Sequence, residues 1–261
     1  MVHPGTSVAR SDVARWLDET LQPDLFQDYA PNGLQVEGRP DIRHVLTGVT
    51  ASRALIDEAI RRGADTLLVH HGWFWKNEDS RICGARRARI ARVLEHGLNL
   101  FAYHLPLDAH PVLGNNARLA HMLDFTPLRD ADGRPRTCGP ANLMWLGECA
   151  PRSLAELADH ISARLGRTAL ALGDPQRRIT RLAWCTGGAQ SMMDVAIAQG
   201  VDAFITGEAS EQNFHQAQES GTAFIAAGHH ATERYGALAL GQALKQEFDI
   251  QVDFVDLFNP V

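Results

Sequence analysis

The sequence predicts an α/β protein of two related domains, each built on a mostly parallel sheet, from a duplicated βαβ-type unit. Apolar, strand-like runs alternate with helix-like segments twice along the chain, and this alternation is typical of βαβ units. The two halves also share a segment. Residues 57–65 read DEAIRRGAD and residues 194–202 read DVAIAQGVD, with five identities in nine positions. Helix-to-strand junctions often converge on Gly-x-Asp, so chance similarity stays an alternative to duplication.

The N-terminal half opens with a helix-like segment and a loop. Residues 11–21 (SDVARWLDETL) space their apolar side chains helically, with Ser11 as a candidate N-cap. Residues 29–38 (YAPNGLQVEG) contain Pro31 and an Asn-Gly pair, which are loop signals. The next segments are expected to be a strand (44–52), a helix ended by Gly63 (53–64), a strand (65–73), a helix ended by Gly97 (86–97) and a strand running into a loop (99–108).

A boundary is expected in the middle of the chain. Residues 125–143 are rich in glycine, proline and charge, as domain boundaries often are. A helix over 152–166 follows, with Ser153 and Glu156 forming a capping box. We therefore expect domains at 1–130 and 131–261, with the C-terminal part of the second able to pack back on the first.

The second half repeats the rhythm of the first. Its segments are expected to be a strand (181–190), a helix (191–200), a strand (201–210), a helix (211–221), a strand (222–230), a helix (235–246) and a last strand (249–257).

Composition narrows the class of protein. The 261 residues are 45% hydrophobic and 21% charged, with a net charge of −6, which suits a globular domain and gives no reason to expect nucleic acid binding. The only basic stretch, 81–92, reads equally well as a solvated helix face. The four cysteines form no C-x-x-C pair. The N-terminal residues lack the apolar core of a signal peptide, and no window has 18 uncharged apolar residues, so we expect neither a signal peptide nor a membrane span. We expect reduced thiols and a cytoplasmic protein.

Two adjacent histidines follow an apolar run at residues 67–72 (LLVHHG). In open α/β sheets, ligands bind just past the carboxyl ends of strands, where His70 and His71 are expected to lie. Successive side chains of a strand point to opposite sides, so the pair suits two neighbouring ions. The alternative is a buried pair that hydrogen-bonds to the backbone.

Matching residues at two further strand ends favour a metal site. His104 and Asp108 follow one strand, with Pro106 arguing for a loop, and His229 and Glu233 show the same spacing after the corresponding strand of the second half. If a helix begins near residue 232, residues four apart share one of its faces. Imidazole and carboxylate suit Zn, Fe, Mn, Ni or Co. His70, His71, Asp108, His229 and Glu233 are enough ligands for two divalent ions, with Glu233 having the longer reach for a bridge.

Other residues have two interpretations each. Glu208 is a candidate general base or an acid at a solvated helix start. Gly187 and Gly188 form either an anion-binding turn or a plain tight turn. Trp73 and Trp75 are candidates for stacking on a substrate ring or for packing against a neighbouring subunit.

Six separated motifs resemble one known family. They are YAPNGLQVEG, GADTLLVHHGWFW, HLPLDAHPVLGNNA, CTGGAQS, GVDAFITGEASEQ and AGHHATERYG. Together they resemble the short bacterial form of the YbgI-type proteins, the GTP cyclohydrolase 1 type 2 homologs, from about residue 28 to the C-terminus. The resemblance implies a dinuclear metal centre between two α/β domains and a ring-shaped (toroidal) homohexamer. It places the metal ligands at His70, His71, Asp108, His229 and Glu233, and it places His104 beside them, where it supports a ligand or faces the substrate.

These observations predict a metal-dependent hydrolase. It would act on a small polar substrate, nucleotide-like by the family's name, through a metal-activated water, with His104 or Glu208 moving the proton. The alternative is a non-enzymatic ring that stores or delivers metal or holds a partner chain. A ring around DNA is disfavoured by the acidic net charge.

Overall fold

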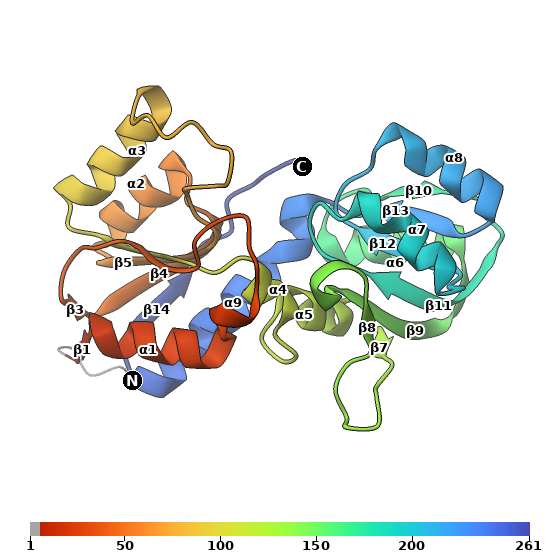
Figure 1. The fold of residues 1–261 in the computed structure, drawn as a ribbon, viewed down its shortest axis with the longest axis horizontal. Helices are drawn as coiled ribbons and strands as arrows, with labels where there is room; N and C mark the ends of the chain where they lie inside the picture. The colour runs from red at the N-terminus through yellow and green to blue at the C-terminus, as the bar shows by residue number, and fades with distance from the viewer. Residues whose placement is uncertain (1–5) are drawn as a thin grey trace. The chain divides into compact units, whose positions relative to one another are not determined.

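The computed structural model describes residues 6–261, which form two compact units (Figure 1). Unit 1 comprises the residues up to Leu107 together with Gly236–Phe258, and unit 2 comprises Asp108–Tyr235 with Asn259–Val261. These bounds differ from a single division at residue 130. The chain leaves unit 1 at Leu107, and the segment Gly236–Phe258 belongs to unit 1 again.

Unit 1 is built on a five-stranded sheet in the order β14-β4-β5-β6-β2. Strands β4 (His44–Thr50), β5 (Thr66–His71), β6 (Asn99–Ala102) and β14 (Gln251–Phe254) are parallel, and β2 (Gly33–Val36) is antiparallel to β6. Figure 1 shows α2 (Arg53–Arg62) and α3 (Gly84–Glu95) on one face and α1 (Arg10–Leu21) on the other. Strands β1 (Val8–Ala9) and β3 (Asp41–Ile42) form a small separate sheet.

Unit 2 has a mixed seven-stranded sheet in the order β10-β13-β12-β11-β9-β7, with β8 also paired to β9. Its centre is parallel: β11 (Arg178–Trp184), β12 (Ala203–Thr206) and β13 (Ala223–Ala226). The antiparallel strands are β7 (Thr126–Pro127), β8 (Thr137–Cys138), β9 (Met144–Ser153) and β10 (Leu170–Leu172). The helices are α5 (Asn115–Met122), α6 (Leu154–Leu165), α7 (Met193–Ala198) and α8 (Glu211–Ser220), with short α4 (Leu105–Ala109) and long α9 (His229–Phe248) at the unit bounds.

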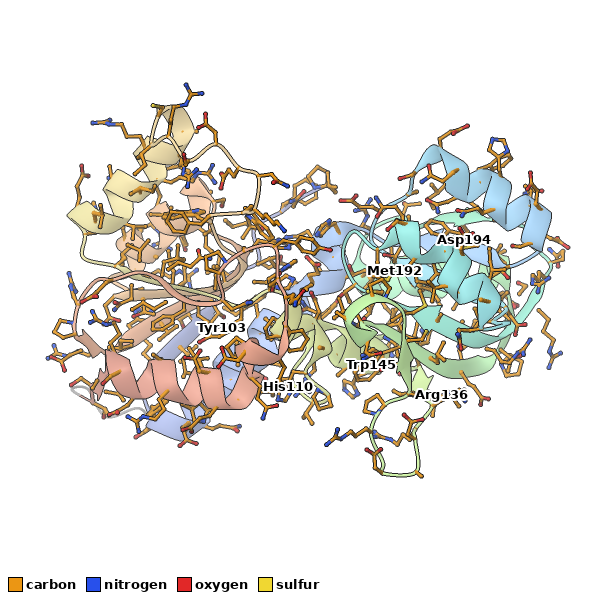
Figure 2. The ribbon with its side chains drawn as sticks, viewed as in Figure 1. Tyr103, His110, Arg136, Trp145, Met192 and Asp194 are labelled. Carbon is orange, nitrogen blue, oxygen red and sulfur yellow. The ribbon has the colours of Figure 1, made fainter. Side chains whose placement is uncertain are left out.

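Buried side chains fill a separate core in each unit. In unit 2, Trp145 (labelled in Figure 2) packs beside Trp184 with ring centroids 6.0 Å apart. In unit 1, Leu67 and Val69 of β5 lie under α2 beside Leu55 and Ile56. The apolar run before the two histidines is therefore a buried central strand, as parallel sheets require.

The shared nine-residue segment makes the same junction in both units. Gly63 and Gly200 each adopt a left-handed conformation after the helix (φ 70° and 66°). The Asp65 carboxylate then accepts hydrogen bonds from the backbone N–H groups of Arg43 and His44 (2.9 and 3.3 Å). The Asp202 carboxylate does the same for Thr180 and Arg181 (3.0 and 2.8 Å). Each aspartate thus binds two adjacent N–H groups in, or directly before, the preceding parallel strand, which supports the duplicated unit.

Several segments differ from the sequence expectation, and three of them lie near the site or in the main sheets. Strand β2 lies within the segment expected to be a loop, and the sequence pattern does not predict β9, because both are antiparallel additions to sheets whose parallel strands dominate the pattern. The loop expected around Pro106 is wrong, because α4 covers Leu105–Ala109. Pro106 occupies the first turn of that helix, where its missing N–H would have no partner in any case.

Two expectations from composition can be compared with the structure. Among residues 6–261, no helix is long and apolar enough to cross a membrane. The four cysteines are free thiols, and Cys149 and Cys185 are buried. Burial, followed by the charges of Asp108 and Glu233, raises the pKa of the Cys185 thiol well above its usual range, so this thiol stays neutral.

Candidate metal centre

The two adjacent histidines end β5, the middle strand of the sheet of unit 1. His70 is fully buried, and its Nδ1 donates to the carbonyl oxygen of Tyr103, just past β6 (3.0 Å). The Nδ1 of His71 lies 3.3 Å from the Thr50 hydroxyl, at the end of β4. The partner of His70 therefore lies just past β6, and the partner of His71 ends β4; these are the two strands on either side of β5. For His70 the bond also fixes the tautomer, because a carbonyl only accepts.

His104 is held by a buried carboxylate. Its Nδ1 donates to Asp28 Oδ1 at 2.7 Å, and only 4% of the Asp28 side chain is exposed. Burial alone would raise the pKa of Asp28, but the hydrogen bond and charge of His104, with further donors from Asn32 and Leu105, lower it to about 2. Asp28 is therefore ionised and accepts a hydrogen bond from the N–H at Nδ1 of His104.

The three imidazoles of unit 1 form one cluster. Their ring centroids are 4.5 Å (His70 to His71), 5.2 Å (His70 to His104) and 5.8 Å (His71 to His104) apart. One nitrogen of each lies within 4.8 Å of the others, so together they could hold a metal ion. Strict alternation along a strand would have separated the rings of His70 and His71. The two ring centroids nevertheless lie only 4.5 Å apart.

The two tryptophans lie in different surroundings. Trp75 packs edge-on against His104, with centroids 4.9 Å apart, and its Nε1 donates to the carbonyl of Gly72 (3.2 Å). Trp73 is 6% exposed, belongs to the core of unit 1 and donates to the carbonyl of Ala51 (3.0 Å). Only Trp75 is therefore placed to contact a molecule bound at the imidazoles.

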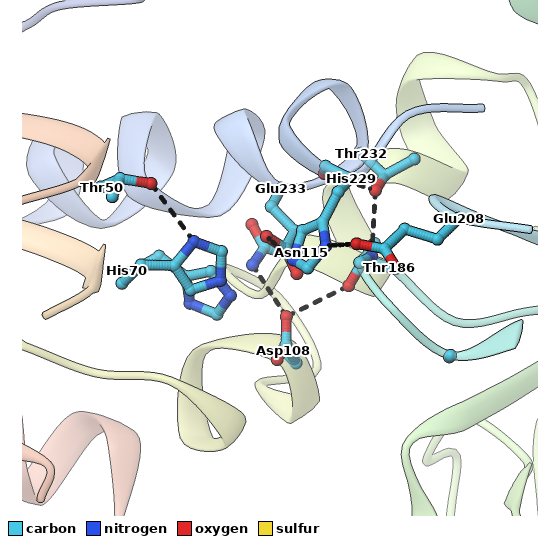
Figure 3. A network of polar contacts seen from close by, with 12 residues as sticks. Thr50, His70, Asp108, Asn115, Thr186, Glu208, His229, Thr232 and Glu233 are labelled. Atoms are coloured by element: carbon cyan, nitrogen blue, oxygen red, sulfur yellow. Dashed lines mark hydrogen bonds and ion pairs between the residues drawn. The ribbon is translucent and has the colours of Figure 1, made fainter. Parts of the chain in front are cut away.

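Asp108 is the first candidate ligand of unit 2. It is buried, and Figure 3 shows its carboxylate with two neutral donors. Its Oδ1 accepts from Asn115 Nδ2 (2.8 Å) and from the Thr186 hydroxyl (3.1 Å). Asn115 begins α5, and Thr186 follows β11. These two donors fix the orientation of the carboxylate.

His229 and Glu233 occupy the first two turns of α9, which begins at His229 rather than near residue 232. Nδ1 of His229 donates to Glu208 Oε1 at 2.7 Å, and its Nε2 lies 3.2 Å from Glu233 Oε2 (Figure 3). Burial lowers the pKa of His229, but the hydrogen bonds and charges of Glu233 and Glu208 outweigh it and raise the pKa to about 9. Two carboxylates thus hold a cation between them, which is the environment that a metal ion also requires.

The turn after β11 leaves room for these side chains. A Cβ on Gly187 would lie 2.0 Å from Glu233 Oε1 and 3.2 Å from His229 Nε2, and its φ is 69°. A Cβ on Gly188 would lie 3.5 Å from His229 Cε1, an ordinary contact. Gly187 N–H donates to the Thr232 hydroxyl (3.0 Å). The two glycines therefore border the side chains of His229 and Glu233.

Sequence reasoning missed the residues that hold the candidate ligands. They are Asp28, Asn32, Thr50 and Thr186. Their signal is weak because each belongs to a loop or strand end far from its partner in sequence. For Asp28 and His104 this separation is 76 residues.

The chain resembles known proteins over nearly its whole length. A family model described as Duf34/NIF3 (NGG1p interacting factor 3) matches residues 8–260. A protein of Neisseria meningitidis serogroup A, named GTP cyclohydrolase 1 type 2 homolog, is 51% identical over 254 residues, covering 97% of this chain and 99% of the relative. A protein of Escherichia coli K12 with the same name is 48% identical over 251 residues, covering 96% and 98%.

Solved structures show the same fold. The protein ybgI, described as of unknown function, superposes with a TM-score of 0.91 at 48% identity, covering 97% of this chain and 100% of that one. A protein of Thermus thermophilus superposes with a TM-score of 0.85 at 31% identity, covering 97% and 100%.

Proposed function

The chain belongs to the Duf34/NIF3 family, and from that premise we propose that it binds divalent metal ions and acts as a metal-dependent hydrolase. The observation that carries the proposal is the imidazole cluster of unit 1, in which three nitrogens lie within 4.8 Å of one another. Clustered imidazoles without thiolates are typical of Zn, Fe, Mn, Ni or Co sites that also keep positions open for a reactant.

The full ligand set of the proposal draws on both units. His70 and His71 supply imidazole nitrogens, and Asp108, His229 and Glu233 supply two carboxylates and a further imidazole. These donors suffice for two ions, and the family resemblance supports this number. Glu233 is the proposed bridging carboxylate.

The proposed reaction divides the chemistry between the ions and the chain. Divalent ions, when bound, supply Lewis acidity, which lowers the pKa of water and polarises the group under attack. Glu208 orients His229 through Nδ1 and is 36% exposed, so it can take up the released proton. Trp75 offers an indole ring beside His104 for a planar part of the substrate.

The substrate is proposed to be a small polar molecule. The relatives named GTP cyclohydrolase 1 type 2 homolog make nucleotides the first compounds to test. We also propose that the chain works as a homohexameric ring in the cytoplasm. Light scattering tests the ring, which should give a mass about six times the 28.7 kDa of one chain.

Metal content tests the binding. Protein purified without chelators should contain about two equivalents of metal per chain, and His70→Ala and Glu233→Ala should each lower this content sharply. His215→Ala is the matched control, because this histidine is exposed on α8. Unchanged metal content in both site variants would refute the proposal.

A substrate screen tests the hydrolase. Nucleotides, phosphoesters and cyclic amides are incubated with the chain and Mn, Zn, Fe or Co, and turnover should disappear in His71→Ala. No turnover with any compound, together with rapidly exchanging metal, would favour a protein that stores or delivers metal.

A further inference from the structure

We propose that Arg118 and His110 bind the phosphate group of a small-molecule ligand, at a site in unit 2 that begins two residues after the candidate metal ligand Asp108. The inference deepens the proposed function, on which the role of this ligand as a substrate rests, because it names a charged group that the substrate carries. Neither Arg118 nor His110 belongs to the proposed metal ligands.

His110 presents a hydrogen-bond donor at Nε2. This residue, labelled in Figure 2, directly follows α4 and is half-buried. Its Nδ1 accepts hydrogen bonds from the backbone N–H groups of Val112 (3.2 Å) and Leu113 (2.9 Å). A ring nitrogen that accepts carries no hydrogen, so the hydrogen of the neutral ring is on Nε2. The turn after α4 therefore fixes the tautomer of His110.

Arg118 presents a guanidinium group without an acceptor. The residue lies on α5 and is half-buried. Its Nε is shielded from solvent and has no hydrogen-bond partner among residues 6–261, and no carboxylate of that part of the chain forms an ion pair with it. A buried donor that lacks a partner costs free energy until a bound molecule or ion supplies an acceptor. An anion would supply the acceptor and also balance the charge.

The two side chains lie close together. The carbonyl oxygen of His110 accepts the N–H of Gly114 (3.0 Å), and the carbonyl oxygen of Gly114 accepts the N–H of Arg118 (2.9 Å), so the three residues follow one another at intervals of one turn. Long side chains of a helix point back toward its N-terminus, which directs Arg118 toward His110. The charge of Arg118 reaches the His110 ring, where it adds to burial in lowering the pKa.

This pair of donors suits an oxyanion, and phosphate in particular. A guanidinium group offers parallel N–H groups that bind two oxygens of a phosphate or a carboxylate. Both oxygens of a carboxylate are then occupied, whereas a phosphate group keeps a further oxygen for Nε2 of His110. The site and Asp108 belong to the same unit, so a phosphorylated substrate would be held by the unit that also supplies proposed metal ligands.

Isothermal titration of the full chain with inorganic phosphate, AMP, adenosine and acetate tests the site. Phosphate and AMP should bind, and adenosine and acetate should bind about 10-fold more weakly or worse. Arg118→Gln should weaken AMP binding about 10-fold or more, and Arg118→Lys should weaken it less, because lysine keeps the charge but loses the parallel N–H groups. Arg178→Gln is the matched control and should change nothing, because Arg178 is exposed on β11 of the same unit.

A substitution of His110 that keeps the turn tests the second donor. The side-chain oxygen of asparagine can accept the N–H two residues on, but asparagine has no donor in place of Nε2. His110→Asn should therefore weaken AMP binding and leave the unfolding temperature nearly unchanged. This variant also decides the question if Arg118→Gln does not fold.

Metal content, measured on the same samples, separates this inference from the proposed function. Because phosphate also binds to metal ions, the titrations are repeated after a chelator has removed the metal, and the difference between the wild type and Arg118→Gln should persist. A chain that binds no metal would refute the proposed function but not the phosphate site. Three results would refute the phosphate site alone: no binding of phosphate or AMP at millimolar concentrations, wild-type affinity in Arg118→Gln, or acetate that binds as tightly as phosphate.

Discussion

Each of the four candidate imidazoles of the metal centre has its Nδ1 in contact with an oxygen: a carbonyl at His70, a hydroxyl at His71 and carboxylates at His104 and His229. These contacts orient each ring before any ion binds. Because the partners are already in place, metal binding needs little rearrangement of the rings.

Gly187 tests the packing beside Glu233. We expect Gly187→Ala to lower metal affinity and stability, because its Cβ would lie 2.0 Å from Glu233 Oε1 and left-handed backbone costs a non-glycine residue about 1–2 kcal/mol. Gly188→Ala is the matched control, since its Cβ makes only ordinary contacts. Chelator competition and thermal unfolding measure both. Equal behaviour of the two variants would contradict the packing described here.

A substitution of Glu208 tests whether this carboxylate orients His229 for metal binding. Glu208→Gln should weaken metal binding about 10-fold or more, because loss of a carboxylate partner of a metal-binding histidine typically has this effect. Glu211→Gln, three residues on and exposed, is the control, and isothermal titration with Zn²⁺ provides the measurement. If Glu208→Gln binds Zn²⁺ as tightly as the wild type, Glu208 does not orient His229 for metal binding.

At the level of elements, the helix-to-strand junction explains why residues 57–65 and 194–202 are similar in sequence. Asp65 and Asp202 each accept hydrogen bonds from two adjacent backbone N–H groups in, or directly before, the parallel strand that precedes the helix. The five identities therefore mark a shared structural role as well as a shared pattern.

Asp202 makes stability depend on pH. Burial opposes ionisation, but hydrogen bonds from Arg181 and Thr180 lower the pKa of Asp202 below its usual 3.8. The folded pKa lies below the unfolded one, so the stabilisation is present above about pH 4 and is lost as pH falls through the folded pKa. Asp202→Ala should lower the free energy of unfolding by about 1–3 kcal/mol at pH 7, and this difference should shrink in acid.

Denaturant unfolding at several pH values measures this difference. Asp159→Ala, exposed on α6, should cost little at any pH. A penalty for Asp202→Ala that persists undiminished at about pH 2–3 would refute the assigned role of the carboxylate.

The parallel strands and their helices were predictable because their apolar periodicity is strong. Strands β4, β5, β6 and β11 to β13 overlap the segments in which the sequence predicts strands, although most of them end earlier than predicted. Strands β2 and β9 were missed because their pairing depends on partners far away in sequence. The candidate ligands were also predictable, because they are histidines and acids that follow these strands, two of the pairs with the same four-residue spacing. Asp28 and Thr50 have no such pattern, because only the folded sheet brings them to their imidazoles.

For the whole molecule, bound metal should act as a stabiliser. A ligand that binds only the folded chain adds about 2.7 kcal/mol when its free concentration is about 100 times Kd. We expect a chelator to lower the unfolding temperature and added Zn²⁺ to restore it. The same treatment should have a much smaller effect on His70→Ala. An equal effect on both proteins would mean that the chelator acts elsewhere.

Anomalous diffraction from crystals of the wild-type chain, grown without chelators and measured on either side of a metal absorption edge, tests the central claim most directly. The account predicts anomalous peaks within bonding distance, about 2.0–2.2 Å, of the imidazoles of His70 and His71. Crystals of metal-supplemented protein with no peak near either imidazole would contradict it.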